Sequence, residues 1–276
     1  MENRLLHIFR NTPLGRESLL QSVYFCNRID AMMTVYVPLS TKFLMYFEND
    51  VVQVDLDESY LTDPATAETH AREIVEQDGG RVAFLTPKHY TASTLPDIPT
   101  DFDFMCCPRS ISDLSSKIGL GYIGPRVRRI VQSARYPVLI TSGAFKPWQS
   151  VTVFFGGSVN AVKACRLGLS IAQQTGMPLD LFTQAGADRS RDDYRQVLEQ
   201  AGLTDALDSA LRQWHFFESG RLEENLYAVA HDTLAVVGAF GHGIIRDIIF
   251  GSKMETIQSV LPNNLLIVGP KYATRL

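Results

Sequence analysis

The chain has 276 residues, of which 45% are hydrophobic and 20% are charged, and its formal net charge is −4. This length can hold one large domain or two ordinary ones. The net charge argues against a broad basic surface for nucleic acid or anionic membranes. No apolar run approaches the roughly 20 residues that cross a bilayer, and the first residues lack the pattern of a signal peptide. We therefore expect a cytoplasmic protein that binds neither nucleic acid nor membrane.

The cysteines form no pattern that predicts a disulfide framework or a zinc site. They are Cys26, Cys106, Cys107 and Cys165. The adjacent pair Cys106-Cys107 lies in an apolar strand. A redox pair is one interpretation, but two buried small hydrophobic residues are favoured, because nothing nearby in the sequence indicates an activated thiol.

The first half opens with a short apolar strand, Leu5–Phe9, which leads through Arg10-Asn11-Thr12 into a helix ending near Asn27. Residues 42–56 alternate as a hairpin does, with Asn49-Asp50 as the turn. We expect these segments to form a strand, a helix and a hairpin in that order.

Three further stretches of the first half carry weaker signals. Residues 86–101 are rich in Thr, Pro and Asp, which is typical of a loop. The acidic run of Asp55, Asp57 and Glu58 lacks the spacing of a metal loop, so we expect a solvated edge. The arginines within 126–129 are candidates for gripping an anion, although a solvated helix face is the commoner outcome for such a cluster.

The two halves of the chain repeat one another. The segment Gly124–Ile140 matches Gly251–Ile267 at a shift of 127 residues, each reading as a glycine turn, a short helix and a buried strand. Leu5–Phe9 matches Val151–Phe155 at a shift of 146, so the first half carries about 19 additional residues. We predict two tandem domains, residues 1–145 and 150–276, with a connector at 142–150.

Strands and helices alternate in the second half. This order, with strands that are apolar on both faces, predicts a parallel sheet covered by helices on both sides. The expected strands are 151–155, 179–183, 213–217, 233–238 and 264–268, and the expected helices are 158–175, 189–201, 221–231 and 252–261.

A glycine pattern follows the fourth of these strands. Gly238 ends the strand, Gly241 follows three residues later, and Gly251 directly precedes Ser252, the expected N-cap of the last helix. A helix N-terminus beside glycine-rich backbone is suited to phosphate. Ordinary turn chemistry is the alternative. His242 and Lys253 lie in or beside this loop, where either contact with phosphate or exposure to solvent is open.

The spacing Gly-x2-Gly-x9-Gly-Ser, set between a strand and a helix, resembles the motif of ATP-binding universal stress proteins. Asp232, which opens the preceding strand, is also similar to that family's pattern. The resemblance is strong over residues 150–270. Over residues 1–142 it depends on the order of elements and on the final repeated unit.

This resemblance implies a fold and a ligand. The fold would be α/β, with two tandem flavodoxin-like domains, each a parallel five-stranded sheet flanked by helices. ATP, with Mg²⁺ as a candidate companion ion, would be held by Gly238, Gly241, Gly251 and Ser252. The family likeness also implies that Val138–Ile140 pairs with Leu265–Val268 within one chain, and it leaves a homodimer open.

Two positions depart from the family's pattern. Gly156 stands where the family usually has an aspartate that helps to hold the nucleoside. In the first half the Gly-x2-Gly element is missing, and Pro125 replaces the Ser or Thr, which removes a hydroxyl and an N–H donor. We infer that the first half does not bind ATP in the family's manner.

The function that we expect is regulatory nucleotide binding in a stress-response protein, with no catalytic residue and no metal ligand assigned. No nucleophile elbow or His-Glu-x-x-His helix occurs in the sequence. Two alternatives stay open. One is a stress-type scaffold that has lost nucleotide binding, and the other is an ATP-using hydrolase.

Overall fold

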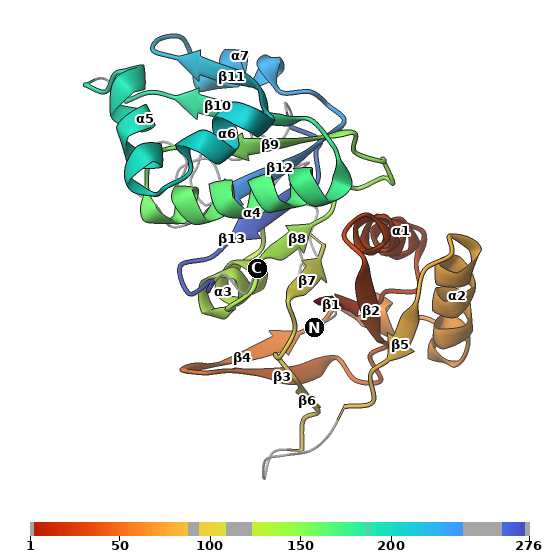
Figure 1. Cartoon of the computed structure of the whole chain (residues 1–276). Coiled ribbons are helices and arrows are strands. Elements are labelled where there is room, and N and C mark those ends of the chain that lie inside the picture. The colour runs from red at the N-terminus through yellow and green to blue at the C-terminus, as the bar shows by residue number, and fades with distance from the viewer. Residues whose placement is uncertain (1–2, 88–93, 109–122, 187, 240–260, 274–276) are drawn as a thin grey trace.

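The structure is a computed structural model that describes residues 3–87, 94–108, 123–186, 188–239 and 261–273 (Figure 1). In the first half the elements are β1 (Asn3–Ile8), α1 (Pro13–Arg28), β2 (Ala31–Tyr36), β3 (Lys42–Phe47), β4 (Asp50–Asp55), η1 (Glu58–Leu61), α2 (Pro64–Gln77), β5 (Val82–Phe84), β6 (Asp97–Ile98), β7 (Phe104–Cys107), α3 (Pro125–Ser133) and β8 (Val138–Ile140). In the second half they are β9 (Ser150–Phe154), α4 (Val159–Thr175), β10 (Leu179–Gln184), α5 (Arg191–Gln200), α6 (Thr204–Ala210), β11 (Leu211–Phe217), α7 (Leu222–Asn225), η2 (Leu226–Ala228), β12 (Thr233–Gly238) and β13 (Leu265–Val268).

The main sheet of the described chain has ten strands in the order β11-β10-β9-β12-β13-β8-β7-β1-β2-β5. Every neighbouring pair within one half is parallel, whereas β13 and β8 pair antiparallel. Counted in chain order within its own half, each set of five main-sheet strands runs 3-2-1-4-5. The α/β fold with a largely parallel sheet is therefore confirmed, with one difference. The two five-stranded sets form one continuous sheet rather than two separate ones.

The junction between the halves is short, and its paired residues are buried. Leu265 pairs with Ile140, Leu266 with Leu139, and Ile267 with Val138, and none of these residues is more than 5% exposed. Burial of apolar surface on both faces of these strands stabilises the junction together with the ladder of backbone hydrogen bonds.

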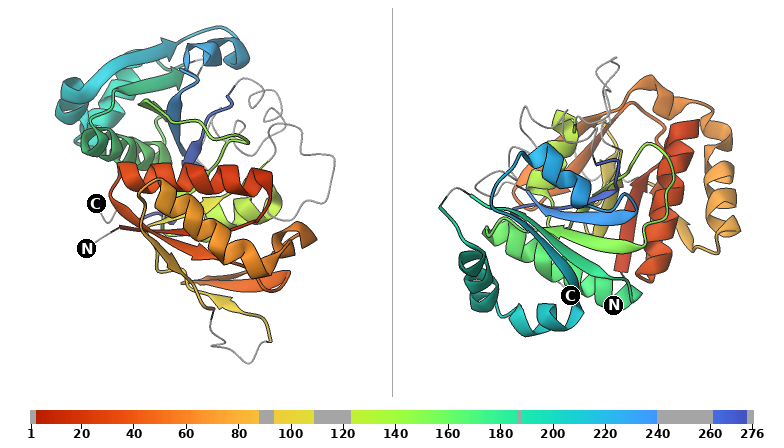
Figure 2. Two further views of the ribbon diagram at one scale, coloured as in Figure 1. Left: turned by 90° about the vertical axis from the view of Figure 1, so that its right-hand side faces the viewer. Right: turned by 90° about the horizontal axis from the view of Figure 1, so that it is seen from above.

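Each face of the sheet has its own hydrophobic core, and both cores run across the junction. Helices α1, α2, α4, α5 and α6 cover one face, and α3, α7 and the hairpin of β3 and β4 cover the other. Figure 2 shows α1 and α2 side by side over the strands of the first half. This arrangement follows from right-handed crossovers, because the chain moves outward from the central strand in one direction and then in the other.

The strands of the second half match the sequence prediction to within two residues, and the described helices differ from it in two places. The helix expected over 252–261 lies outside the described residues, except for residue 261. Helix α6 was not predicted, since it has no side-chain N-cap and is held on the sheet by the buried Leu207. The helix expected over 221–231 is shorter. Its apolar residues Leu222, Leu226 and Val229 have helical spacing, but the α-helix ends at Asn225 and continues as a 3₁₀ turn.

The predicted hairpin is present, and its inner residues alternate into the core. Phe47 pairs with Asp50, so the turn consists of Glu48 and Asn49, one position earlier than expected. The Thr- and Pro-rich stretch contains one short strand, β6, which pairs parallel with β3. Residues of this kind can add to a sheet edge when a neighbouring strand offers free backbone groups.

Acidic residues of the hairpin bind arginines of α3. Arg126 pairs with Asp55 at 2.7 Å, and Arg129 pairs with Asp50 at 2.9 Å. The expected solvated edge is wrong for Asp55, whereas Glu58 is exposed as expected. Arg126 and Arg129 bind carboxylates, and Arg128 donates to the carbonyl of Ile123 at 2.8 Å. Asp57 is also largely buried, and its carboxylate accepts a hydrogen bond from the backbone N–H of Ser59 as the cap of η1.

The connector between the halves is tied to α1. Gln21 donates to the carbonyl of Ala144 at 2.8 Å, and Tyr24 donates to the carbonyl of Trp148 at 2.7 Å. Asn264, at the start of β13, donates to Gln21 at 2.8 Å and accepts from the backbone N–H of Ser142 at 2.9 Å. These buried polar groups fix the connector against both halves of the sheet. Of the helices that the structure describes, none is long and apolar enough to span a bilayer.

Replacing Asn264 with alanine tests the junction. Asn264→Ala removes the partner of Gln21 Oε1 and that of the Ser142 N–H, so we expect a loss of ~1–3 kcal/mol in the free energy of unfolding. Urea denaturation measures this change. Asn27→Ala is the control, because its bond to the Asp78 carbonyl is exposed and its loss is expected within about 0.5 kcal/mol. Equal effects of the two variants would contradict the role of the junction network.

Asp50 links the hairpin to α3 in a pH-dependent way. Its hydrogen bonds to Arg129 and Ser133 lower the pKa of the Asp50 carboxyl from 3.8 to about 2. A carboxyl with a lowered folded-state pKa stabilises the protein above its unfolded value, and that stability is lost as the pH falls towards 2.

We therefore expect Asp50→Asn to flatten the decline of stability between about pH 5 and pH 2, measured by urea denaturation across that range. Asp208→Asn, which removes an exposed ion pair with Arg195, is the control and should keep the wild-type profile. An unchanged acid limb in Asp50→Asn would show that this carboxylate is not linked to folding.

Candidate functional site

The strand order of the second half creates a topological switch point at the carboxyl ends of β9 and β12. The chain leaves β9 towards β10 on one side, and β12 lies on the other side of β9 (Figure 1). Such topological switch points are where open α/β sheets bind ligands. The glycine pattern predicted from the sequence begins at this position.

Gly238 is placed at the end of β12, and packing explains why it is glycine. A Cβ atom at this position would lie 2.3 Å from the carbonyl oxygen of Asn160 in the first turn of α4. The Asn160 side chain, which is 8% exposed, donates to the carbonyl of Ala239 at 2.5 Å. The end of β12 is therefore held against the start of α4 by close backbone approach and by one buried hydrogen bond.

The turn between β9 and α4 lies on the other side of the switch point. Gly157 has a φ of +72°, a left-handed conformation that favours glycine. Ser158 caps α4, its side chain accepting from the backbone N–H of Ala161 at 3.2 Å. The N-terminus of a 17-residue helix thus lies at the switch point, where its positive dipole end favours an anion.

Arg189 brings a positive charge to the same turn, and sequence reasoning missed it. Its Nη1 atom lies 2.9 Å from the position that a Cβ of Gly157 would occupy. The guanidinium stacks on Tyr194, 4.7 Å from the ring centroid, and the Tyr194 hydroxyl accepts from the backbone N–H of Gly186 at 3.2 Å. The available signal was positional, because a loop that follows β10 must reach the same carboxyl edge as the loop that follows β9.

The other predicted site residues lie outside the described residues. These are Gly241, Gly251 and Ser252, together with His242 and Lys253. The structure therefore describes Gly238, the first glycine of the pattern, but not the other residues of the pattern. Gly156 lies directly before Gly157 in the turn after β9, where the family's aspartate would stand. In the parts of the chain that the structure describes, no group of three or more His, Cys, Asp or Glu residues could hold a metal ion.

The first half agrees with two sequence interpretations. Cys106 and Cys107 are buried in β7, and burial raises the pKa of the Cys106 thiol to about 11 and that of Cys107 as well. Both thiols are therefore protonated near neutral pH, as expected of small hydrophobic residues. Helix α3 begins with Pro125 at its first position, which removes one backbone N–H donor from the end of the helix where a phosphate would bind.

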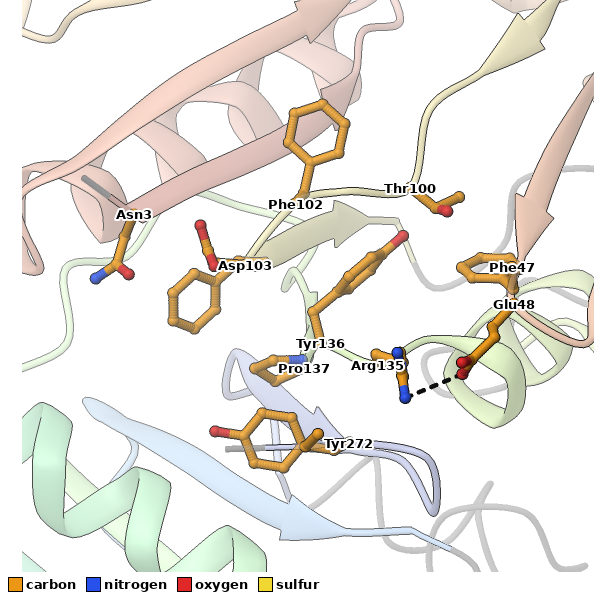
Figure 3. Close-up of a pocket in the computed structure, with 12 residues that line it drawn as sticks. Asn3, Phe47, Glu48, Thr100, Phe102, Asp103, Arg135, Tyr136, Pro137 and Tyr272 are labelled. Atoms are coloured by element: carbon orange, nitrogen blue, oxygen red, sulfur yellow. Dashed lines mark ion pairs between the residues drawn. The ribbon is translucent and has the colours of Figure 1, made fainter. Parts of the chain in front are cut away.

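A cavity opens in the first half, at the amino-terminal ends of its strands β1, β7 and β8 (Figure 3). Aromatic side chains including Phe102, Tyr136 and Tyr272 line it, and an ion pair of 3.0 Å between Arg135 and Glu48 lies at its border. Its volume is about 60 Å³. Pockets for drug-sized ligands and cofactors span roughly 300–1,000 Å³, so this cavity does not suit a nucleotide.

Comparison with known proteins agrees with the fold. No protein-family model matches the chain. A universal stress protein of Synechocystis sp. is 24% identical over 172 residues, which is 59% of this chain and 56% of that relative. The solved structure of a universal stress protein from Archaeoglobus fulgidus has a TM-score of 0.62 at 15% identity, covering 98% of this chain and 99% of the other. The resemblance to universal stress proteins is confirmed.

A second solved structure supports this family fold. A putative universal stress protein from Pseudomonas aeruginosa matches with a TM-score of 0.54 at 12% identity and covers 98% of this chain and 94% of the other. The structural likeness therefore extends over nearly the whole of this chain, whereas the match to the Synechocystis relative spans little more than half of that relative's length.

The packing of Gly238 can be tested without any ligand. We expect Gly238→Ala to lower the free energy of unfolding by ~1–3 kcal/mol, because the added methyl group meets backbone atoms that cannot rotate away. Gly186→Ala is a matched control at the same edge of the sheet, since a Cβ there meets nothing within 4 Å. Thermal or urea unfolding measures both variants. A Gly238→Ala protein as stable as Gly186→Ala would contradict the close approach.

Proposed function

We propose that this chain is a stress-response protein of the universal stress type that binds ATP in its second half and acts by regulation rather than by catalysis. The observation that supports this proposal most strongly is the position of Gly238. The strand that opens the Gly-x2-Gly-x9-Gly-Ser pattern ends at the switch point, directly beside the first turn of α4. The glycine-rich segment thus starts where a nucleotide would bind in this fold.

The residues at the switch point fit an anionic ligand. The N-terminus of α4 supplies a positive dipole end, and Arg189 supplies a guanidinium next to the Gly157 turn. Hydrogen bonds from Ser190 lower the pKa of the Asp193 carboxyl, and the charge of Arg189 also contributes to lowering it. In the proposal, backbone at Gly238, Gly241 and Gly251 wraps the ribose and phosphates, Ser252 bonds a phosphate oxygen, and Arg189 adds positive charge. The binding or release of ATP would change the conformation of the chain or the partner that it binds.

The stress-response role follows from likeness. The relative from Synechocystis and the solved structure from Archaeoglobus fulgidus are both named universal stress proteins. A regulatory role suits a site to which the sequence assigns a binding loop but no general base or nucleophile.

A scaffold without nucleotide is the second candidate, and one observation favours it. The clash at Asn160 accounts for Gly238 by packing alone, so this glycine is required whether or not ATP binds. Gly156, in place of the family's aspartate, points the same way. The two candidates make opposite predictions for nucleotide binding.

Titration calorimetry of the purified chain with ATP, with and without Mg²⁺, distinguishes the nucleotide-binding protein from the scaffold. We expect the wild type to bind ATP, and we expect Gly241→Arg to abolish binding because a long side chain would fill the glycine loop. Arg189→Gln should weaken binding about tenfold, or ~1.4 kcal/mol, through the loss of one charge-assisted contact.

Arg191→Gln is the matched control for Arg189→Gln, because Arg191 lies two residues further on and stacks on Trp214 at 4.9 Å. It should bind ATP as the wild type does. If the wild type and Gly241→Arg both fail to bind, the scaffold is correct. Steady product formation that a Gly251→Ala/Ser252→Ala double variant lacks would instead favour the hydrolase.

A further inference from the structure

The first half has its own switch point, between the carboxyl ends of β1 and β7, and a cavity of about 150 Å³ opens there. Residues that follow β1, β7 and β8 line it, together with the first turns of α1. Engineered apolar cavities of this volume take up benzene, so the space suffices for one small ring.

Arg10 lines this cavity with its hydrogen-bonding groups unused. Its side chain is 27% exposed, yet its guanidinium makes no hydrogen bond within the described chain, and its Nε atom is buried without a partner. The nearest carboxylate oxygen, on Asp57, is 3.5 Å from Nη2, which is longer than a normal hydrogen bond. Asp57 already accepts from the backbone N–H and the hydroxyl of Ser59. A guanidinium has five donors, and leaving them unpaired at such burial is costly.

Two further polar groups of the lining lack partners. The ring of Tyr60 lies beneath the Arg10 guanidinium, with 5.4 Å between the guanidinium carbon and the ring centroid, and the residue is 2% exposed; its hydroxyl makes no hydrogen bond to the described residues. His7 bonds Ser22 through Nδ1 at 2.9 Å, while its Nε2 is buried and unpartnered. Burial raises the pKa of the Tyr60 hydroxyl and lowers the pKa of His7 to about 3, so Tyr60 is a neutral donor and His7 is uncharged near neutral pH.

The remaining walls are largely apolar. Ile8, Leu14 and Pro108 contribute to the lining, and Leu14 is 65% exposed at the start of α1. The hydroxyls of Ser18 and Thr141, which also line the cavity, already bond each other at 2.9 Å. A ligand here would meet one cation, one phenol and one uncharged imidazole nitrogen, that of His7, on a surface that is otherwise largely apolar.

We propose that this cavity is a second ligand site, which binds a small monocarboxylate with an apolar body through Arg10 and Tyr60. The carboxylate accepts hydrogen bonds from the guanidinium and the phenol, and the apolar body lies against Ile8, Leu14 and Pro108. A single negative charge matches the local charges, because Asp57 offsets part of the charge of Arg10. A triphosphate or a free phosphate dianion would leave excess negative charge beside Asp57. The site does not depend on ATP binding in the second half.

Ligand-observed NMR titration with benzoate tests the proposal. We expect saturable binding of millimolar order to the wild-type chain. Arg10→Gln should weaken it at least tenfold, and Tyr60→Phe, which removes only the hydroxyl, about threefold. Arg28→Gln is the matched control, because Arg28 also stacks on a tyrosine, Tyr24, at 4.9 Å, and it should bind within twofold of wild type. Thermal melting confirms that each variant is folded.

Three probes define the ligand class. Benzamide, a neutral analogue of similar shape, and inorganic phosphate should both bind at least tenfold more weakly than benzoate. ATP should not displace benzoate. The proposal is overturned if benzoate shows no saturable binding up to about 10 mM, if folded Arg10→Gln and Tyr60→Phe both bind it as the wild type does, or if phosphate or benzamide matches it. Displacement by ATP would make the cavity a nucleotide site and also overturn it, whereas loss of ATP binding in Gly241→Arg leaves this test unaffected.

Discussion

Three residues of β8 and three of β13 form the antiparallel ladder that joins the two halves of this chain. Both strands are buried on both faces, and both hydrophobic cores continue across them. Because the main-sheet strands of each half are parallel to one another, the antiparallel pairing of β8 with β13 turns the two halves in opposite directions. The carboxyl edge of the second half therefore faces the opposite way from that of the first. Asn264, Gln21 and Ser142 reinforce the junction with hydrogen bonds that replace those to water.

This geometry separates the two switch points and lets them differ. The switch point beside Gly238 combines a helix N-terminus, a left-handed glycine turn and Arg189. The cavity of the first half instead has Arg10 and Tyr60 on apolar walls, and its α3 begins with a proline and no side-chain cap. The two halves thus share one strand order, while the residues at their carboxyl edges differ. We interpret the second half as the nucleotide side and the first as a site for a smaller anion.

Sequence periodicity predicted most of the strands and the fold class because buried parallel strands are apolar on both faces and are separated by helices. It did not predict α6, which depends on the contact of Leu207 with the core rather than on a cap. The acidic run at residues 55–58 looked solvated because its arginine partners are remote in the chain: Arg126 pairs with Asp55 across 71 residues, and Arg10 lies 3.5 Å from Asp57. Gly238 was predicted from a motif, but the 2.3 Å approach to Asn160 that requires glycine is a tertiary contact. Arg10, Arg189 and Tyr60 carry no motif, and only the fold brings them to the edges of the sheet.

The central claim is that the two edges have different ligands, with nucleotide confined to one of them. The most direct measurement is the stoichiometry of ATP binding to the full chain by native mass spectrometry, with Arg10→Gln and Gly241→Arg measured alongside. The account predicts one ATP per chain in the wild type and in Arg10→Gln, and none in Gly241→Arg. Two ATP molecules per chain, or a single one that Arg10→Gln removes, would contradict it.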